Sequence, residues 1–218
     1  EDEGVIGGMV REVTPALNEH VYMYDVASMY PHIIIYWNVG LDTYTKNPTL
    51  DDTRAVGTEH GYKSAPGIFA SSIRTMLDER RRFQDTLKSV EPGTREALNA
   101  TAVQAIMKEF ANAMYGIMAS RHMRYYQQHI AESITLAGQY ILKFMIEYFE
   151  DRGGTVVFAD TDSCAVTYGH RNDEHLAIKS ALEDALEKHL FETFNVQNAR
   201  FVIKHEKTYD RLLVASKK

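Results

Sequence analysis

Two aspartates flank a single threonine in the run Asp160-Thr161-Asp162. The residues on either side are apolar, small or β-branched, which is typical of two short strands joined by a tight turn. Carboxylates held close together repel each other, and a multivalent cation between them offsets that repulsion. Carboxylate oxygens are ligands that suit Mg²⁺ and Mn²⁺ better than zinc. The run therefore predicts a Mg²⁺ site, with Mn²⁺ as an alternative ion.

A third carboxylate, Asp25, ends an apolar run that is typical of a strand, and Ser28 and Pro31 indicate a turn or helix start directly after it. An aspartate at a strand end that faces a hairpin with two more is the layout of a two-metal site for phosphoryl transfer. The alternative is an ordinary turn residue at the end of a strand. The hairpin favours the metal site.

Lys108, Asn112 and Tyr115 recur at positions i, i+4 and i+7, so they share one face of a predicted helix. They form either a face that binds a phosphate and a base, or a solvated lysine beside a partly buried asparagine and tyrosine. Spacing alone favours the second interpretation. Gly116 favours the first, because a glycine permits a base to approach closely.

Four segments, taken in order, resemble the conserved motifs of family B DNA polymerases. They are Asp25-Val26-Ala27-Ser28-Met29-Tyr30-Pro31 (motif A, DxxSLYPS), Lys108 to Gly116 (motif B, KxxxNSxYG), Asp160-Thr161-Asp162-Ser163 (motif C), and Glu206 to Arg211 followed by Lys217-Lys218 (the approach to KKRY). Gly7-Gly8 also looks like the end of the YxGG element. The sequence departs from these patterns at Val5, His32, Gln84, Ala113 and Ala159.

The resemblance implies an α+β fold. We expect a polymerase palm, with a ferredoxin-like split β-α-β sheet that is parallel or mixed and holds its carboxylates on one open face. A two-helix fingers hairpin is inserted into it. We expect residues 1–40 to form the first part of the palm, 41–120 the fingers, and 121–218 the second part of the palm. This length has no room for the exonuclease and thumb domains of the family, so we interpret the chain as a fragment of a larger polymerase.

The implied activity is that of a DNA-directed DNA polymerase, which adds deoxynucleotides to a primer 3′ end with two Mg²⁺ ions. By resemblance, Asp25 and Asp162 are ligands of both ions, Asp160 has a secondary role, and the Val26 carbonyl completes one coordination shell. Lys108 joins them as a catalytic residue that binds phosphate.

The remaining roles also follow from the resemblance. The residues expected at the dNTP are Ser28, Met29, Tyr30, Arg80, Lys108, Asn112 and Tyr115. Tyr30 is expected to exclude a 2′-hydroxyl, and the alternative is that it is a tyrosine of the core. Arg80 is expected to bind the triphosphate, and the alternative is that it belongs to a solvated charged face. The residues expected at the primer–template are Gly7, Gly8, Gly116, Lys207, Tyr209, Arg211 and Lys218. The alternative for the last residues is a basic edge strand that resists aggregation.

Periodicity and breakers predict the elements around these residues. We expect strands over 6–12 and 20–25, a short helix over 28–37, and a loop-rich stretch over 38–66. We then expect helices over 68–90, 94–118, 124–151 and 172–194, with the hairpin between the last two, and strands over 200–207 and 211–216.

Composition is that of a soluble globular protein, with 44% hydrophobic and 25% charged residues, and no apolar run or signal peptide suggests a membrane. The single cysteine, Cys164, excludes an internal disulfide. The net charge of −6 argues mildly against nucleic acid binding, but basic residues cluster locally, for example at 80–82 and 204–218. We expect an intracellular protein that binds DNA, with the missing polymerase domains in cis or on another chain.

Two rival functions remain. One is another two-metal enzyme such as a nucleotide cyclase, which needs the carboxylates but no template. The other is a fragment that is inert alone and binds DNA or a partner chain.

Overall fold

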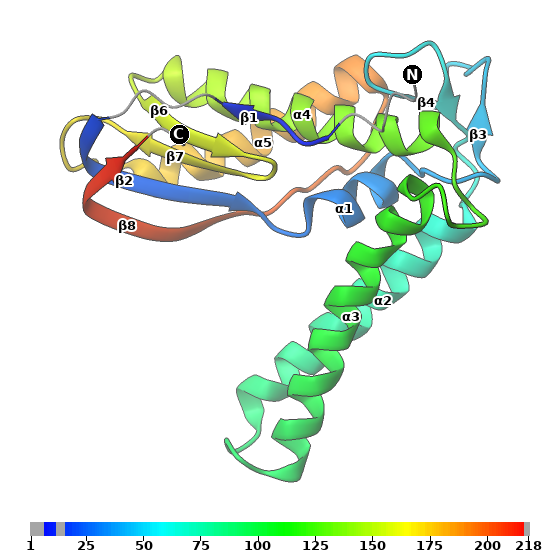
Figure 1. Ribbon diagram of the computed structural model, residues 1–218, viewed down its shortest axis with the longest axis horizontal. Helices are drawn as coiled ribbons and strands as arrows, with labels where there is room; N and C mark the ends of the chain where they lie inside the picture. Colours follow the sequence, from blue (N-terminus) through cyan, green and yellow to red (C-terminus); the bar gives the residue numbers. More distant parts are fainter. Residues whose placement is uncertain (1–6, 12–15, 216–218) are drawn as a thin grey trace. The chain divides into compact units, whose positions relative to one another are not determined.

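The computed structural model describes residues 7–11 and 16–215 (Figure 1). Contacts divide the described chain into two compact units. The helical unit comprises residues 30–134, and the sheet unit comprises residues 7–11, 16–29 and 135–215. The division at residues 40 and 120 that the sequence suggests for palm and fingers stays a prediction. No helix in the described ranges has the length and hydropathy needed to cross a bilayer.

The sheet unit is built on five strands in the order β1-β6-β7-β2-β8. The strands are β1 (Val10–Arg11), β2 (Ala16–Val26), β6 (Thr155–Asp160), β7 (Ser163–Thr167) and β8 (Ile203–Val214). Every described pair of neighbours is antiparallel, so the expectation of a parallel or mixed sheet was wrong. The strand that pairs with β2 is β7 and not β6. Since the hairpin reverses the chain between β6 and β7, β7 runs antiparallel to β2.

Two helices pack against one face of this sheet. They are α4 (Gln128–Glu150), whose residues from 135 onward belong to the sheet unit, and α5 (His175–Phe194). Tyr24 of β2 is fully buried; its ring stacks on Phe149 of α4 with centroids 4.9 Å apart, and its hydroxyl lies 3.1 Å from Nδ1 of His175 in α5. Such an aromatic pair contributes about 1 kcal/mol beyond its area burial. The core therefore lies between the sheet and both helices.

Three of the differences between predicted and observed elements concern β1, β8 and the start of α4, the last of which lies in the helical unit. Of the predicted strand 6–12, residues 10–11 form β1, and residues 6 and 12 lie outside the described ranges. The helix expected to start at 124 begins at Gln128, because residues 120–127 form turns such as Met123 N–H to Ser120 O. The two strands expected at the C-terminal end are one strand, β8, because the residues between them pair with β2 as well.

The helical unit contains α1 (Met29–Tyr36, of which Tyr30 onward belongs here), α2 (Ile68–Ser89) and α3 (Arg95–Ala119). The expected loop-rich stretch 38–66 holds a small antiparallel sheet, β3-β5-β4, made of Tyr44–Thr45, Gly61–Tyr62 and Thr53–Arg54. This stretch is held in place by hydrogen bonds that buried side chains make. The Trp37 indole donates to the Arg54 carbonyl, and the Tyr62 and Ser133 hydroxyls form a hydrogen bond.

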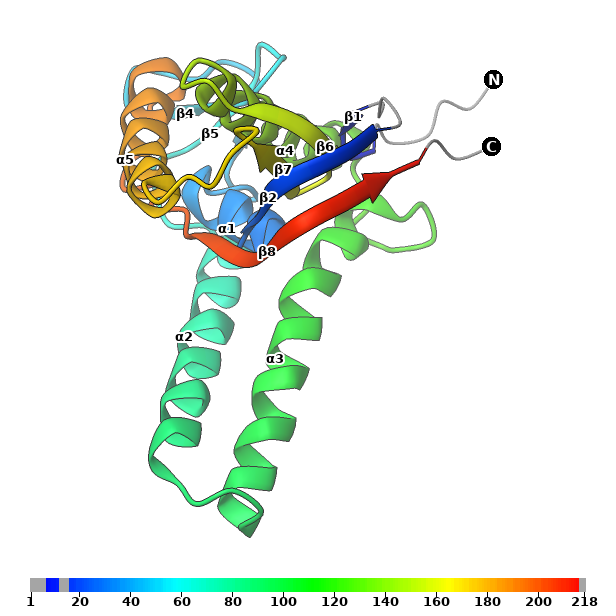
Figure 2. The same ribbon diagram turned by 90° about the vertical axis from the view of Figure 1, so that its left-hand side faces the viewer.

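Helices α2 and α3 lie side by side as an antiparallel pair (Figure 2). Both spans were predicted and are confirmed to within two residues. Thr94 is the N-cap of α3, since its hydroxyl accepts a hydrogen bond from Ala97 N at 3.2 Å, which stabilises such a helix by about 1 kcal/mol. The turn before it contains Gly93 at φ +85°, a conformation that suits glycine.

Candidate active site

Asp25 and Asp160 come to lie on one face of the sheet, although they are 135 positions apart in the sequence. Asp25 pairs with Ser163 across β2 and β7, and the same Ser163 pairs with Asp160 across the hairpin. Residues directly opposite each other in an antiparallel ladder point to the same side. Two strand spacings separate the two aspartate backbones, roughly 10 Å. We call this side the carboxylate face; it is opposite to the face that packs on α4 and α5.

Asp162 joins them from the hairpin turn. Its carbonyl accepts a hydrogen bond from Val26 N at 2.8 Å, so its backbone lies beside the residue that follows Asp25. Burial raises the pKa of Asp162, and the carboxylates of Asp160 and Glu206 raise it further against the opposing effect of its own N–H. The site therefore concentrates negative charge, and a cation bound there would stabilise the ionised form of Asp162.

The hairpin turn itself is strained. Thr161, between the two aspartates, has φ +53°, a left-handed conformation that is unfavourable for a β-branched residue. Such a conformation costs on the order of 1–3 kcal/mol and persists only where the surroundings enforce it. The Thr161 hydroxyl donates to Asp160 Oδ1 at 2.8 Å, and Asp162 N–H donates to Asp160 O at 2.7 Å. These bonds fix the spacing of the two aspartates.

The donor set suits Mg²⁺, because it consists of carboxylates that share one face with high local negative charge. Mg²⁺ characteristically takes one or two protein carboxylates and fills its other positions with water and substrate phosphates. Within residues 7–11 and 16–215, no group of three or more His, Cys, Asp or Glu side chains forms a ready-made metal centre. The Val26 side chain is fully buried, and the backbone N–H of Val26 donates its hydrogen bond to the Asp162 carbonyl.

The expected DNA-contacting residues of β8 share the carboxylate face. Lys207, Tyr209 and Arg211 alternate along the strand, and Lys207 pairs with Met23, two positions before Asp25. The Lys207 ammonium lies 4.7 Å from the centre of the Tyr209 ring, and Arg211 Nε lies 3.3 Å from Glu19. Lys218 lies outside the described residues. A basic row thus runs along the same side of the sheet as the acidic group.

A β-bulge in β8 decides which side chains join that row. Tyr24 pairs with His205 and Met23 with Lys207, which leaves Glu206 as an extra residue without a pairing position. Because of this extra residue, Lys204, which pairs with Asp25, and Lys207 lie on the same side despite being three positions apart. The sequence analysis did not select Lys204 or Glu206 individually, and nothing in the local pattern marks the bulge.

Lys108 and Asn112 are exposed on α3, and Tyr115 is half-buried there with its pKa raised by burial. The Tyr115 ring lies against that of Tyr30, with centroids 4.9 Å apart and planes inclined at 36°. A methyl group added to Gly116 would meet no heavy atom within 4 Å, so nothing within the described chain requires glycine there. The helical unit thus brings together the two tyrosines expected at the nucleotide.

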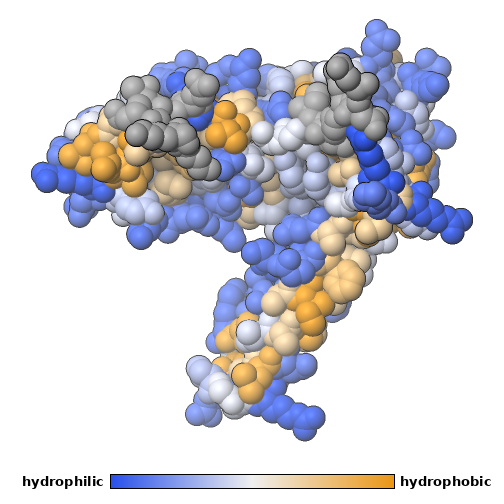
Figure 3. All heavy atoms as spheres, viewed as in Figure 1, coloured by the Kyte–Doolittle hydropathy of each residue, from blue (hydrophilic) through white to orange (hydrophobic). Residues whose placement is uncertain are grey.

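Other nucleotide-binding predictions fall at the junction before α1 and on α2. Ser28 has φ +51° in the turn, and the Met29 side chain is buried, so only the Met29 backbone remains for an anion. Arg80 is half-buried on α2, whereas its neighbours Arg81 and Arg82 are exposed and ion-paired with Asp78 and Glu79. Figure 3 shows apolar side chains along the α2–α3 pair, and exposed Leu98, Ile106 and Phe110 belong to α3.

The two glycines expected at DNA lie in the sheet unit. The Gly7 carbonyl accepts a hydrogen bond from Gln139 Nε2 at 2.6 Å. Gly8 lies against Thr161 at the tip of the hairpin. The predicted residues therefore fall into two sets. Asp25, Asp160, Asp162, Gly7, Gly8, Lys207, Tyr209 and Arg211 belong to the sheet unit, and Tyr30, Arg80, Lys108, Asn112, Tyr115 and Gly116 to the helical unit.

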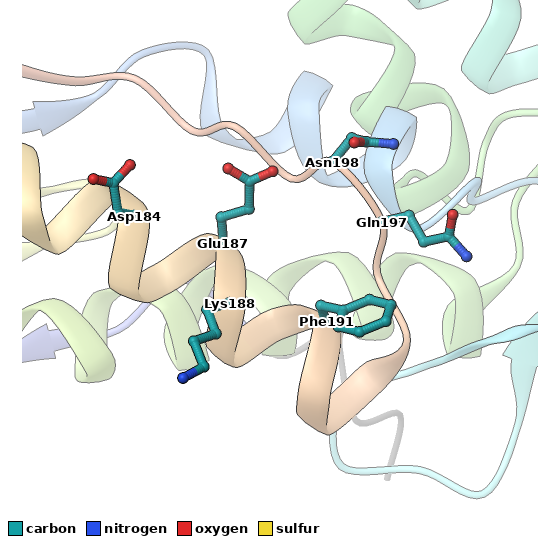
Figure 4. A pocket seen from close by; sticks show the side chains of 6 residues that line it. All are labelled: Asp184, Glu187, Lys188, Phe191, Gln197 and Asn198. Atoms are coloured by element: carbon teal, nitrogen blue, oxygen red, sulfur yellow. The ribbon is translucent and has the colours of Figure 1, made fainter.

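A separate hollow of about 560 Å³ lies beside the second half of α5 (Figure 4). It is lined by Asp184, Glu187, Lys188, Phe191, Gln197 and Asn198, and includes none of the predicted site residues. Glu187 at its edge lies 3.6 Å from Arg200. This hollow is on an element that supports the sheet from its other face.

Known proteins similar to this chain agree with one another. The family model for DNA polymerase family B matches residues 1–218. The chain is 32% identical over 166 residues to a DNA polymerase of Archaeoglobus fulgidus, covering 76% of this chain and 21% of that protein. It is 35% identical over 168 residues to a DNA polymerase of Desulfurococcus sp. (strain Tok), covering 76% and 22%.

A solved structure is similar as well. The family B DNA polymerase of the hyperthermophilic archaeon Pyrobaculum calidifontis matches with a TM-score of 0.68 and 29% identity, over 100% of this chain and 27% of that one. The chain thus spans about a fifth of the length of the curated relatives and about a quarter of the solved structure.

Proposed function

Because the chain belongs to DNA polymerase family B, we propose that it carries the catalytic residues of a DNA-directed DNA polymerase, which adds deoxynucleotides to a primer 3′ end. The observation that carries the proposal is the convergence of Asp25 and Asp160 on one face through their shared neighbour Ser163. Asp162 stands beside them, with its pKa raised by burial and by neighbouring carboxylates. In this proposal the sheet unit is the palm, and the α2–α3 pair is the fingers.

Asp25 and Asp162 would hold two Mg²⁺ ions, with Asp160 in a secondary role and the Val26 carbonyl as a further ligand. When bound, such ions lower the pKa of the primer 3′-hydroxyl and neutralise charge on the phosphates. The chain's own contribution is to keep the carboxylates in a fixed arrangement. The short bonds of the hairpin turn serve this end, because pre-organised charges stabilise a transition state without reorganising.

The helical unit would hold the incoming dNTP. Lys108 and Arg80 would bind its triphosphate, with Asn112 as a polar neighbour, and the N–H groups of residues 28–30 would add donors as helix starts do for anions. Tyr115 would lie under the nascent base pair, where exposed Gly116 leaves open space. Tyr30, packed on Tyr115, would occupy the volume that a 2′-hydroxyl needs.

Lys207, Tyr209 and Arg211 would contact the primer–template backbone. Their place on the carboxylate face supports this, because a DNA end held there lies beside the acidic residues. Such contacts position the duplex and carry no sequence information. By resemblance, Lys218, which lies outside the described residues, would contact the same backbone. Full activity would require the exonuclease and thumb domains, and the protein would act inside the cell, where its DNA is.

The test is extension of a labelled primer on a DNA template with dNTPs and Mg²⁺. We expect extension by the chain placed within the Archaeoglobus fulgidus polymerase in exchange for the matching segment, and loss of at least about 10²- to 10³-fold in the Asp162→Ala variant. DNA binding should persist in that variant, since phosphate contacts lie elsewhere. Asp184→Ala, on exposed α5 surface, is the control.

Undiminished extension by the Asp162→Ala variant would contradict the metal assignment. A cyclic nucleotide formed from NTP without template would instead favour a cyclase. Extension by the isolated chain would exclude the remaining rival, which is a fragment that is inert alone and only binds primer–template in a gel-shift assay.

A further inference from the structure

Residues 7–11 run along the edge of the sheet unit and are fixed at both ends to α4. Gln139 Nε2 donates to the Gly7 carbonyl at 2.6 Å, and Arg11 Nη1 forms a 2.6 Å ion pair with Glu150. Between these anchors, β1 pairs with the last residues of β6, up to and including the first hairpin aspartate. The segment therefore lies against the hairpin and is held there by contacts to a helix.

The middle of this segment touches the hairpin tip. Thr161 N–H donates to the Met9 carbonyl at 2.9 Å. A methyl group added to Gly8 would lie 2.7 Å from Thr161 Oγ1, 3.1 Å from Cγ2 and 3.2 Å from Cβ. The 2.7 Å contact to the oxygen is too short to exist without displacement, and the two contacts to carbon are tight enough that Thr161 must give by a few tenths of an ångström. By contrast, a methyl group on Gly7 would meet no heavy atom within 4 Å.

Thr161 has little freedom to give way. Its hydroxyl donates a hydrogen bond to Asp160 Oδ1 at 2.8 Å. Rotation about the Cα–Cβ bond would still leave a γ atom near the added methyl group, and the contact with Cβ would not change. Its backbone is already in the left-handed region at φ +53°. Any shift of this residue is passed to Asp160 and Asp162, which are its chain neighbours.

We propose that Gly8 is a positioning residue of the hairpin. Because Gly8 has no side chain, Thr161 can pack directly against residues 7–11. The Met9 carbonyl accepts a hydrogen bond from Thr161 N–H and so holds the threonine backbone in its left-handed conformation. Together they set the spacing of Asp160 and Asp162. This differs from the DNA contact that the motif suggests for Gly8. The catalytic consequence rests on the proposed function, whereas the structural consequence does not.

The structural test is amide hydrogen exchange on the 218-residue chain, free of DNA and metal, followed by NMR. In Gly8→Ala we expect exchange at the Thr161 amide to accelerate by about tenfold or more, because its bond to Met9 is broken. Gly7→Ala is the matched control and should change that rate by less than about twofold. Circular dichroism melting shows whether each variant is folded.

Rescue separates a specific contact from general damage. Thr161→Gly removes all three atoms that crowd Gly8 and also relieves the positive φ. In the Thr161→Gly background, adding Gly8→Ala should therefore leave the melting temperature and the amide exchange rate of Ser163 unchanged. The effects of the two substitutions on stability would then be strongly non-additive. Additive losses in this cycle would overturn the proposal, even if Gly8→Ala alone folds poorly.

The catalytic test uses primer extension in the chimeric polymerase described above. Gly8→Ala should lower kcat by roughly 10- to 100-fold while leaving KM for dNTP and Kd for primer–template within about twofold, because misplacement by about 1 Å costs rate and not binding. Weakened DNA binding in both Gly8→Ala and Gly7→Ala, with normal Thr161 exchange, would overturn the proposal. If the parent chimera does not extend primers, the proposed function fails, and the exchange data still decide the role of Gly8.

Discussion

The proposed nucleotide face on α3 and the carboxylate face of the sheet are assembled in different ways. Lys108, Asn112 and Tyr115 share a side because an α-helix repeats every 3.6 residues, so two short spacings along the sequence suffice. Asp25 and Asp160 share a side only because three strands pair in one particular register. Local geometry determines the first arrangement, and long-range pairing determines the second.

The difference extends to how each region tolerates change. On the exposed face of α3, a substitution at Lys108 or Asn112 changes one side chain and leaves its neighbours in place. In the sheet, insertion or loss of one residue moves every following side chain to the opposite face. Two bulges, at Val157 in β6 and Glu206 in β8, perform such shifts in the native chain. The sheet should therefore be sensitive to length and the helix to side-chain identity.

In the comparison of these two regions, the largest effect is expected from deleting Glu206. Without the extra residue, either Lys204 or the row from Lys207 must move to the face that packs on the helices. We expect primer extension to fall by at least about 10²-fold, with a lower melting temperature. Glu206→Ala is the matched control, since it removes the carboxylate but keeps the bulge, and it should retain most activity. Full activity in the deletion variant would show that the register is not required.

Lys108→Ala should have the next largest effect, and it should be confined to nucleotide binding. Loss of a charged hydrogen bond to phosphate should raise KM for dNTP roughly 10- to 100-fold, with little change in melting temperature because the side chain is exposed. Steady-state extension measures this. Glu109→Ala, the adjacent exposed residue on a different side of α3, should leave KM unchanged. An unaltered KM in Lys108→Ala would leave the lysine as a solvated surface residue.

Tyr30→Ala should act on sugar choice. Removal of the ring opens the space proposed to exclude a 2′-hydroxyl, so discrimination between dNTP and rNTP should fall by roughly 10- to 100-fold. Competition between labelled dNTP and rNTP measures it, and Tyr30→Phe should keep the discrimination. A drop in stability with unchanged discrimination would instead identify Tyr30 as a core residue that only packs on Tyr115.

The smallest effect is a pH dependence of stability in the helical unit. Burial lowers the pKa of His60, and nearby His129 lowers it further; burial also lowers the pKa of His129, where Lys46 acts in the same direction and Glu132 opposes it. The unfolded chain then binds more protons than the folded one, so stability is lost as pH falls through the unfolded value near 6.5.

Melting curves between pH 7.5 and 5 measure this effect. His60→Gln should flatten the dependence, since the buried Nε2 of His60 has no hydrogen-bond partner among the described residues. Replacement of exposed His170 by Gln is the control and should leave the slope unchanged. An equal slope in both variants would assign the pH dependence to other groups.

Sequence patterns located the elements better than they located their partners. The spans 68–90 and 94–118 were recognisable because apolar residues recur with helical periodicity, and Pro92-Gly93 with Thr94 separates them. The antiparallel character of the sheet was missed because it depends on which strand of the hairpin reaches β2. The continuity of β8 was missed because Thr208 and Tyr209, between the predicted strands, are paired only with residues far away in the chain.

Short-range patterns along the chain predict the acidic hairpin, the aspartate at a strand end and the shared helical face of Lys108, Asn112 and Tyr115, because each depends on neighbours a few positions apart. Long-range pairing and packing bring the aspartates onto one face, place Glu206 near enough to raise the pKa of Asp162, and set Gly8 against Thr161. The physical reason is that strand register and bulges are set by pairing between distant segments, which a local pattern does not encode.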